Sequence, residues 1–417
     1  MDLELLQVKP IIRTKDLFPD FINDLIFSFE NILSTNLEKG IKLDFDLKIR
    51  SQFDKKTPIL QIAKPEEAKE IVEIFNSAYK GTYPYIEMVD EQEILKMIQD
   101  PDFHWIVFKI DYQIIVGCYG FHVDYENKSG TFHGFAIKRE YQNHVDVLKI
   151  ILGCIYAIVN TYKDKILVWS CEIRTAHSIS QYMGLISGLY PVAFLPNKDI
   201  FFDRIESSLL FIMYDDIVFQ KFQSKRIPNV LLDAASCYLH SKLKYKLGKV
   251  RFKNPDIDID LIKVNEIRKH VEIKVTPHNL SYEKISLFIE NSDSYFEFCF
   301  APYILNCEKT QYKVNSLEEL YVFIQEVKSL IRKLHIRYFE CFISTREPVH
   351  QKLFCNAGFK PRGYIPSWKY IKAEKVFEDY IVFNYYTGNT ENIQLIPESL
   401  RLLESLNISV GLDSKVI

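Results

Sequence analysis

Two segments of this chain, 170 residues apart, resemble each other without a gap. Residues 171–196 and 341–366 are identical at seven of 26 positions, whereas ordinary residue usage would give about 1.6 identities by chance. The identical pairs are Cys171/Cys341, Ile173/Ile343, Thr175/Thr345, Gln181/Gln351, Gly188/Gly358, Pro191/Pro361 and Pro196/Pro366. Gly and Pro residues, which often end helices and strands, are among these pairs. The repeat therefore predicts that the chain has two related halves.

The first half is predicted to follow the order β-α-α-β-β-β-α-β-α-β-β. Apolar residues recur at helical spacing in the predicted helices and form short β-rich runs in the predicted strands. The expected strands are 58–63, 104–110, 114–124, 131–137, 166–171, one through Pro191, and 208–214. The expected helices are 64–79, 90–99, 147–162 and one that ends at Gly188.

The second half repeats the last five of these elements and has a shorter stretch before them. The repeated elements are a helix at 317–332, a strand at 336–343, a helix ending at Gly358, a strand through Pro361 and a strand at 380–386. The stretch before them is predicted to hold strands at 271–275 and 295–304 and a helix at 281–290. We therefore expect this half to lack the second helix and one or two strands.

These elements divide the chain into five parts. We expect an N-terminal extension at 1–56, a first domain at 57–220, a linker with a helix at 221–268, a truncated second domain at 269–388, and a C-terminal helix and tail at 389–417. Additional elements are predicted as a helix at 18–32, a strand at 41–49, and helices at 229–244 and 397–406.

Composition excludes several functional classes. The chain has 52 Lys and Arg against 55 Asp and Glu, a net charge of −3, which gives no electrostatic footprint for nucleic acid or an anionic membrane. The longest apolar stretch, 147–159, is shorter than the roughly 20 residues that span a bilayer, and the chain does not begin like a signal peptide. Eight cysteines without a CxxC pair indicate buried thiols in a reducing cytoplasm. With no HExxH or ordered His/Asp cluster, we expect no metal site.

The element order and three short segments resemble the GNAT family of acyl-CoA-dependent N-acetyltransferases. Residues 137–142 look like the family's exit from strand four into the acyl-CoA loop, 78–84 like the loop that walls the acceptor site, and 356–361 like the end of helix four. The resemblance implies an α+β (mixed α/β) fold with two GNAT-like lobes. Each lobe would be a mixed, mainly antiparallel, twisted sheet flanked by helices, and the second lobe would be truncated.

The resemblance also implies an activity and the residues that carry it. Acetyl-CoA or another acyl-CoA would be the acyl donor, and a small-molecule or peptide amine would attack the thioester directly in the first lobe. The residues implied for acyl-CoA are Phe135, Ala136, Ile137, Gln142, Asn143, His144 and Val145. The acceptor site would use Tyr79, Thr82, Tyr83 and Glu172. The candidates for proton transfer are His133 and His122 as bases and Tyr182 as an acid.

The sequence departs from the family at two points, so other functions stay open. The acyl-CoA loop has no glycine, and Asp146 would either face the pyrophosphate or cap the following helix. The family's acidic tyrosine is replaced by Gly184 in one half and by Phe354 in the other. The alternatives are a non-catalytic binding module on the same scaffold and a Fem-like two-lobe aminoacyltransferase. We expect an open cleft in the first half alone.

Overall fold

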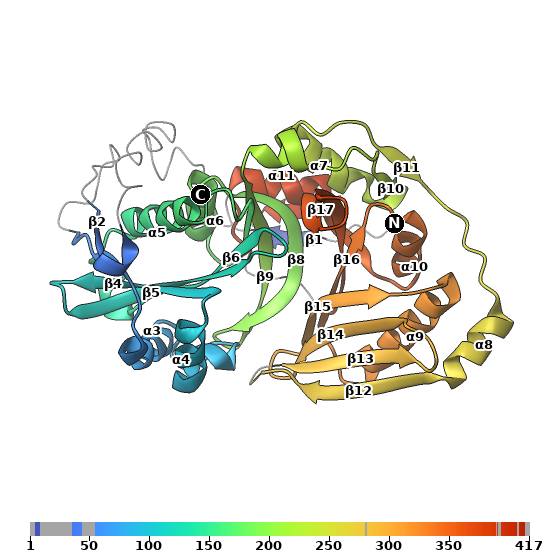
Figure 1. Cartoon of the computed structure of the whole chain (residues 1–417), viewed down its shortest axis with the longest axis horizontal. Coiled ribbons are helices and arrows are strands. Elements are labelled where there is room, and N and C mark those ends of the chain that lie inside the picture. The colour runs from blue at the N-terminus through green and yellow to red at the C-terminus, as the bar shows by residue number, and fades with distance from the viewer. Residues whose placement is uncertain are drawn as a thin grey trace.

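The computed structural model describes residues 5–8, 36–43, 55–279, 282–388, 390, 393–406 and 408–412. The predicted helix at 18–32, most of the predicted strand at 41–49 and the tail at 413–417 lie outside the described residues. Within them, one long mixed sheet runs through the molecule and helices pack on its faces (Figure 1).

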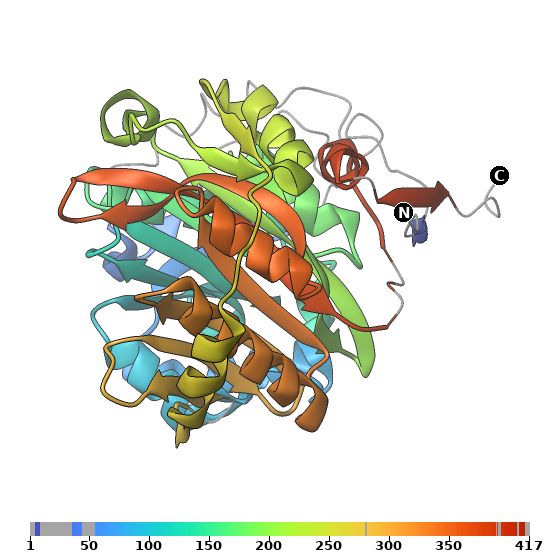
Figure 2. The ribbon, with the colours of Figure 1, turned by 90° about the vertical axis from the view of Figure 1, so that its right-hand side faces the viewer.

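The sheet has fifteen strands. The first half of the chain supplies β2 (Ile41–Lys42), β3 (Ile59–Ile62), β4 (Phe103–Ile110), β5 (Ile114–Asp124), β6 (Ser129–Ile137), β7 (Val168–Arg174), β8 (Tyr190–Phe201) and β9 (Arg204–Tyr214). The second half supplies β12 (Val271–Pro277), β13 (Glu283–Ile289), β14 (Tyr295–Ala301), β15 (Asn306–Lys313), β16 (Tyr338–Ser344), β17 (Lys360–Ile371) and β18 (Val376–Tyr386). Two short parallel pairs lie apart from it: β1 (Leu5–Val8) with β19 (Ser409–Leu412), and β10 (Asn229–Leu231) with β11 (Arg251–Lys253) (Figure 2).

The helices begin and end where local chemistry favours it. They are α3 (Ala68–Tyr79), α4 (Glu91–Gln99), α5 (Val147–Thr161), α6 (Ser178–Ile186), α7 (Ala235–Tyr245), α8 (Leu261–Lys269), α9 (Leu317–Lys333), α10 (Pro348–Asn356) and α11 (Pro397–Ser405). Asp90 caps α4 by accepting a hydrogen bond from the N–H of Glu93 at 3.0 Å. Gly188 and Gly358 follow α6 and α10 with φ of +92° and +96°, the left-handed conformation in which glycine ends a helix.

The seven main strands of each half have the same order. The first half reads β3-β4-β5-β6-β7-β9-β8, and the second reads β12-β13-β14-β15-β16-β18-β17. In both, the pairing is antiparallel except for one parallel pair, β6 with β7 and β15 with β16. The predicted mixed fold with mainly antiparallel sheets is therefore confirmed.

The two halves join through β8 and β17, which pair antiparallel at Ala193 and Gly363. These residues are 170 apart, so each faces its own counterpart in the repeat, as a twofold axis requires. A Cβ at position 363 would lie 2.3 Å from the Cβ of Ala193. Glycine is therefore needed where the two sheets meet.

The second half corrects two predictions. The helix predicted at 281–290 is wrong, because 283–289 form β13, in which Ile285, Leu287 and Ile289 alternate inward and are buried. This half keeps seven strands and has lost the helices that separate the first two strands of the first half. The predicted helix at 229–244 begins only at Ala235, after β10, and α8 was not predicted.

The apolar cores lie between the sheet and its helices. In the first half α5 packs on the sheet beside Phe121, Trp169 and Phe211, all of which are buried. In the second half α9 takes the same place, beside Phe296 and Phe339. The chain from β11 to α8 runs along the outside of the second half (Figures 1 and 2).

Candidate functional site

Strands β6 and β7 separate part of the way along their length. Their parallel pairing runs from Ser129 opposite Val168 to Phe132 opposite Cys171 and then ends. Strand β6 continues to Ile137 and β7 to Arg174. The sheet therefore opens between the carboxyl ends of two neighbouring strands, and backbone groups beyond Phe132 no longer pair across it.

The residues predicted to hold acyl-CoA lie along the β6 side of this opening and in the turn that follows. Ala136 and Ile137 are buried, and Gln142 Nε2 donates to the carbonyl of Ile137 at 3.3 Å. Phe135 is half-buried, Gln142, Asn143 and His144 are exposed, and Val145 is fully buried.

Part of the turn's backbone is already paired with the segment before β3. The N–H of Lys56 donates to the carbonyl of His144 at 2.8 Å, and the N–H of Asp146 donates to the carbonyl of Lys56 at 3.1 Å. These bonds take one acceptor and one donor of the segment that was expected to face a pyrophosphate.

Carboxylates occupy the N-terminus of α5, where a phosphate was expected, and that of its repeat counterpart α9. At α5, Asp146 Oδ1 accepts from the N–H of Lys149 at 3.2 Å. At α9, Glu319 Oε2 accepts from the N–H groups of Asn315 and Ser316, at 2.7 and 3.0 Å. Of the two interpretations of Asp146, the structure therefore supports the helix cap.

The two candidate histidines lie on the neighbouring strands β5 and β6 and are half-buried. His133 packs over Gly120 against Phe103 and Trp105, and burial lowers the pKa of His133 to about 4. Burial also lowers the pKa of His122. With a pKa of about 4, His133 is neutral at pH 7 and is a weak base.

Tyr182 lies on α6 and only 1% of it is exposed, in the core with Trp169 and Phe211. Burial raises the pKa of its hydroxyl to about 12. The packing therefore accounts for Tyr182 without a reacting group.

Three of the four predicted acceptor residues, Tyr79, Thr82 and Tyr83, come together. The Tyr79 and Tyr83 rings have centroids 4.5 Å apart, and Thr82 Oγ1 accepts from the N–H of Phe202 at 3.2 Å. The tip of the β8–β9 hairpin thereby closes over the loop after α3. At this place Phe201 lies 5.8 Å from Tyr79, centroid to centroid.

Arg174 is the polar centre of this aromatic group. Its guanidinium carbon is 4.0 Å from the ring centroid of Phe201 and 6.0 Å from that of Tyr79. Its Nε and Nη2 donate to Glu206 at 2.7 and 2.8 Å, a bidentate pair. Because Arg174 is the last residue of β7, the group stands at the mouth of the β6–β7 opening.

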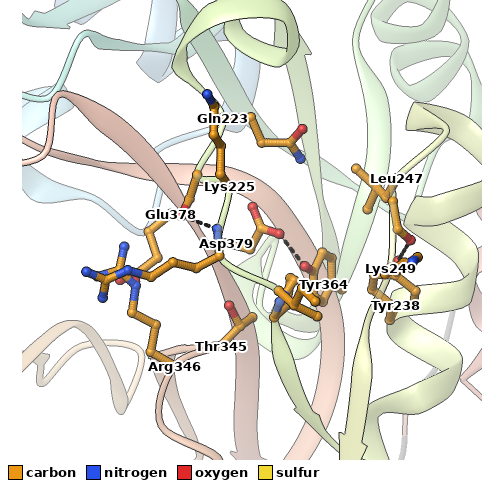
Figure 3. A pocket seen from close by; sticks show the side chains of 15 residues that line it. Gln223, Lys225, Tyr238, Leu247, Lys249, Thr345, Arg346, Tyr364, Glu378 and Asp379 are labelled. Atoms are coloured by element: carbon orange, nitrogen blue, oxygen red, sulfur yellow. Dashed lines mark hydrogen bonds and ion pairs between the residues drawn. The ribbon is translucent and has the colours of Figure 1, made fainter.

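A cavity of about 150 Å³ lies between the linker, at 223–228 and α7, and the ends of β16 and β18 in the second half (Figure 3). Four of its lining residues are basic: Lys225, Arg226, Lys249 and Arg346. On its inner side the Tyr364 hydroxyl donates to Asp379, whose pKa is raised by burial. This polar cavity counts against the expectation of an open cleft in the first half alone.

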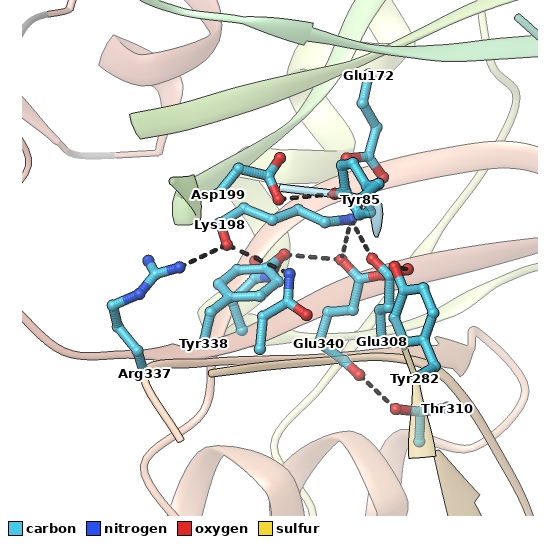
Figure 4. A network of polar contacts seen from close by, with 12 residues as sticks. Tyr85, Glu172, Lys198, Asp199, Tyr282, Glu308, Thr310, Arg337, Tyr338 and Glu340 are labelled. Carbon is cyan, nitrogen blue, oxygen red and sulfur yellow. Dashed lines mark hydrogen bonds and ion pairs between the residues drawn. The ribbon is translucent and has the colours of Figure 1, made fainter. Parts of the chain in front are cut away.

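Glu172 belongs to a polar network in which both halves take part (Figure 4). Lys198 of β8 is 1% exposed at its side chain, and its Nζ contacts carboxylates of Glu172 at 2.6 Å, Glu308 at 3.1 Å and Glu340 at 3.3 Å. Asp199 is buried beside it and accepts from the hydroxyl of Tyr85 at 2.7 Å. One ammonium thus faces three carboxylates with a fourth nearby.

This network fills the opening of the second half. The parallel pairing of β15 and β16 ends at Cys307 opposite Phe339, and Glu308 and Glu340 are the next residues. The Lys198 ammonium therefore lies where the two strands separate.

The surroundings shift the pKa values of these carboxyl groups in different directions. Burial raises the pKa of Glu340 and of Asp199 to about 7 each, although Lys198 opposes the shift. Burial also acts to raise the pKa of Glu308, but Lys198 and Lys309 outweigh it, so that this pKa is lowered. The three contacting carboxylates hold the pKa of Lys198 well above its usual range, against the effect of its burial.

Sequence reasoning identified Glu172 and missed Arg174, Lys198, Glu308 and Glu340. The only sequence signal was the charged pair at 198–199 within an otherwise apolar strand. Among the described residues, no group of three or more His, Cys, Asp or Glu is arranged to hold a metal ion. In the same part of the chain, no helix is long and apolar enough to cross a membrane.

No family model matches this sequence, and no curated protein matches it. The fold is similar to solved acetyltransferases. A spermidine N-acetyltransferase SpeG chimera from Vibrio cholerae and hSSAT is 14% identical with a TM-score of 0.32, covering 37% of this chain and 93% of its own. The microcin C7 self-immunity acetyltransferase MccE, in complex with acetyl-CoA and AMP, is 15% identical with a TM-score of 0.31, covering 38% and 92%.

The ribosomal-protein-S18-alanine N-acetyltransferase from Escherichia coli is 13% identical with a TM-score of 0.31, covering 37% and 92%. All three neighbours are acetyltransferases.

Proposed function

We propose that this chain is a GNAT-type N-acyltransferase that acts in its first half, residues 57–220. The observation that carries the proposal is the separation of β6 from β7 after Phe132, with the predicted acyl-CoA residues along one side. An extended thioester arm could bond to the free backbone of β6, as a strand would. In the reaction, the amine nitrogen attacks the thioester carbonyl, a C–N bond forms, and the C–S bond breaks to release CoA.

The acceptor amine would enter at the mouth of the opening, beside Tyr79, Thr82, Tyr83 and Glu172. Aromatic rings and a half-exposed carboxylate suit a protonated amine before it loses its proton. We propose that the proton of the attacking amine passes through water to the departing CoA thiolate, because the low pKa of His133 makes a direct role as base weak.

We further propose that residues 57–220 and 269–388 are two GNAT-like domains in tandem, joined by a linker at 221–268. The shared strand order and the pairing of Ala193 with Gly363 support this arrangement. The second domain would serve as a scaffold, because Lys198 fills its strand opening.

A specific observation favours a second candidate, a non-catalytic binding module. The N-termini of α5 and α9 are both capped by the chain's own carboxylates, Asp146 and Glu319, and these repel a pyrophosphate. The net charge of −3 gives no support for the tRNA partner that the Fem-like alternative would need.

Two measurements distinguish the candidates. The first is calorimetric titration of the protein with acetyl-CoA. The second is mass spectrometry of a panel of amines incubated with the protein and acetyl-CoA. Saturable binding and an acetylated amine are expected for the enzyme. Absence of heat and of product at millimolar acetyl-CoA would overturn the acyltransferase proposal and leave the module.

A further inference from the structure

Strand β12 ends the fifteen-stranded sheet, and its outer edge is open. It pairs with β13 alone, in an unbroken antiparallel register from Val271 opposite Ile289 to Pro277 opposite Glu283. Figure 1 shows it at the border of the molecule, with no further element beside it. Its backbone groups on that side have no strand to pair with among the described residues.

The edge carries little of the protection that natural edge strands have. Such strands are usually short, bulged, covered, charged, or interrupted by proline, and of these β12 has the charges of Glu272 and Lys274. Strand β12 is seven residues long, its register has no bulge, and its only proline is the last residue. Ile273 and Val275 are 44% and 54% exposed on the face that carries α9.

The same border continues onto α8, which packs beside α9. Ion pairs of Lys263 with Glu318 and of Arg268 with Glu326 hold α8 there. Yet Leu261 and Ile262 of α8 are 62% and 79% exposed. An apolar border next to an open strand edge is the pattern of an interaction surface.

The sequence of β12 is complementary to itself in one register. When two copies run antiparallel and Ile273 faces Ile273, Glu272 faces Lys274 and Val271 faces Val275, each pair occurring twice. Centring the pair on Lys274 instead would bring two lysines together. Opposite charges across a strand pair stabilise it and like charges destabilise it.

We propose that β12 pairs with β12 of a second copy of this chain, in the register centred on Ile273. The two fifteen-stranded sheets then become continuous, and the exposed apolar side chains of β12 and α8 are covered. The contact is the same patch on both copies, so it closes as a twofold dimer and does not grow into a filament. This inference is independent of the proposed catalytic activity.

Sedimentation equilibrium of the full chain tests the proposal with charge exchanges on β12. Glu272→Lys and Lys274→Glu each turn two attractive pairs into two repulsive ones, so each is expected to raise the dimer dissociation constant by about tenfold or more. The double variant Glu272→Lys/Lys274→Glu is expected to dimerise like the wild type. The two single variants mixed in equal amounts are expected to form a mixed dimer.

Lys69→Glu, an exposed change of equal charge on α3 in the other half, is the matched control and should leave dimerisation unchanged. Melting curves establish that every variant is folded. A wild-type chain that stays monomeric at its highest soluble concentration would overturn the proposal. A dimer that both single variants leave unweakened would overturn it as well.

Discussion

Gln181 and Gln351, at equivalent positions of α6 and α10, make the same pair of backbone hydrogen bonds. Gln181 Nε2 donates to the carbonyl of Gln394 at 2.6 Å, and its Oε1 accepts from the N–H of Ile396 at 3.4 Å. Gln351 holds the segment 229–231 in the same way, at 3.1 and 2.7 Å. Each glutamine therefore fixes an extended segment that comes from the opposite half.

The two segments are exchanged between the halves. The segment 229–231 follows the first half and binds the second, while the segment 394–396 follows the second half and binds the first. Each also donates an N–H to the carbonyl of a repeated threonine, Thr345 or Thr175. The helices α7 and α11 come directly after these segments and pack against β17 and β8.

Replacing either glutamine by alanine is expected to destabilise the whole protein. Both side chains are fully buried, and their loss leaves buried backbone donors and acceptors unpaired, at about 1–3 kcal/mol for each variant. Urea unfolding of Gln181→Ala and Gln351→Ala measures this free energy. If the free energy of unfolding falls by less than about 0.5 kcal/mol, the range of ordinary surface changes, the glutamines do not fix these segments.

Lys198→Met is expected to be among the most destabilising single changes in the chain. It removes the ammonium that contacts Glu172, Glu308 and Glu340, and breaking a buried ion pair costs about 3–5 kcal/mol. Glu172→Gln is the matched control, because Glu172 is 37% exposed at its side chain and can remain solvated. Equal losses for the two variants in urea unfolding would show that Lys198 does not hold the network together.

Glu340 should make the protein less stable as the pH rises. Its folded pKa of about 7 lies above the ordinary value of 4.5, so between these pH values the folded chain keeps a proton that the unfolded chain has released. Raising the pH therefore favours unfolding, by at most about 1.4 kcal/mol per pH unit. Unfolding free energies from pH 4.5 to 7 should fall less steeply for Glu340→Gln than for the wild type, and parallel curves would contradict this.

Asp146→Ser keeps a side chain that can cap α5 but removes the negative charge of the aspartate. Serine is also a good cap, so the melting temperature is expected to stay the same, whereas Asp146→Ala should lower it. If the first half binds acetyl-CoA, removing the charge should tighten binding about tenfold, equivalent to 1–2 kcal/mol. Titration of both variants with acetyl-CoA measures the effect. Unchanged affinity would mean that this helix end does not face the pyrophosphate.

The helices and strands could be predicted where the Gly and Pro residues at their ends agree with the spacing of the apolar residues. Gly188 and Gly358 end α6 and α10, and the alignment of the two halves followed from them. The prediction failed at 281–290, because the apolar run Leu287–Ile289 conceals the alternation of a strand. Short apolar runs fit either structure until their neighbours are known.

The site was only partly predictable. Tyr79, Thr82 and Tyr83 are close in sequence, and one loop brings them together. The partners of Lys198 lie on β7, β15 and β16, and Glu340 is 142 residues from it. Which carboxylates would meet one lysine depends on how the two sheets join, and no local pattern carries that information.

The repeat positions 198 and 368 show how the two halves have diverged. Lys198 contacts Glu172, and the counterparts of these residues, Trp368 and Phe342, are stacked aromatic rings with centroids 5.4 Å apart. An ion pair and an aromatic stack thus occupy equivalent places beside β8 and β17.

The exchange of segments has a mechanical consequence. Neither half is expected to fold normally without the other, because the segment that follows each half, 229–231 or 394–396, binds to the opposite half. Heating should therefore give one melting transition for both halves, where two independent domains would give two. During synthesis, the first half cannot bind its segment 394–396 until these residues leave the ribosome, some 180 residues after β9 is complete.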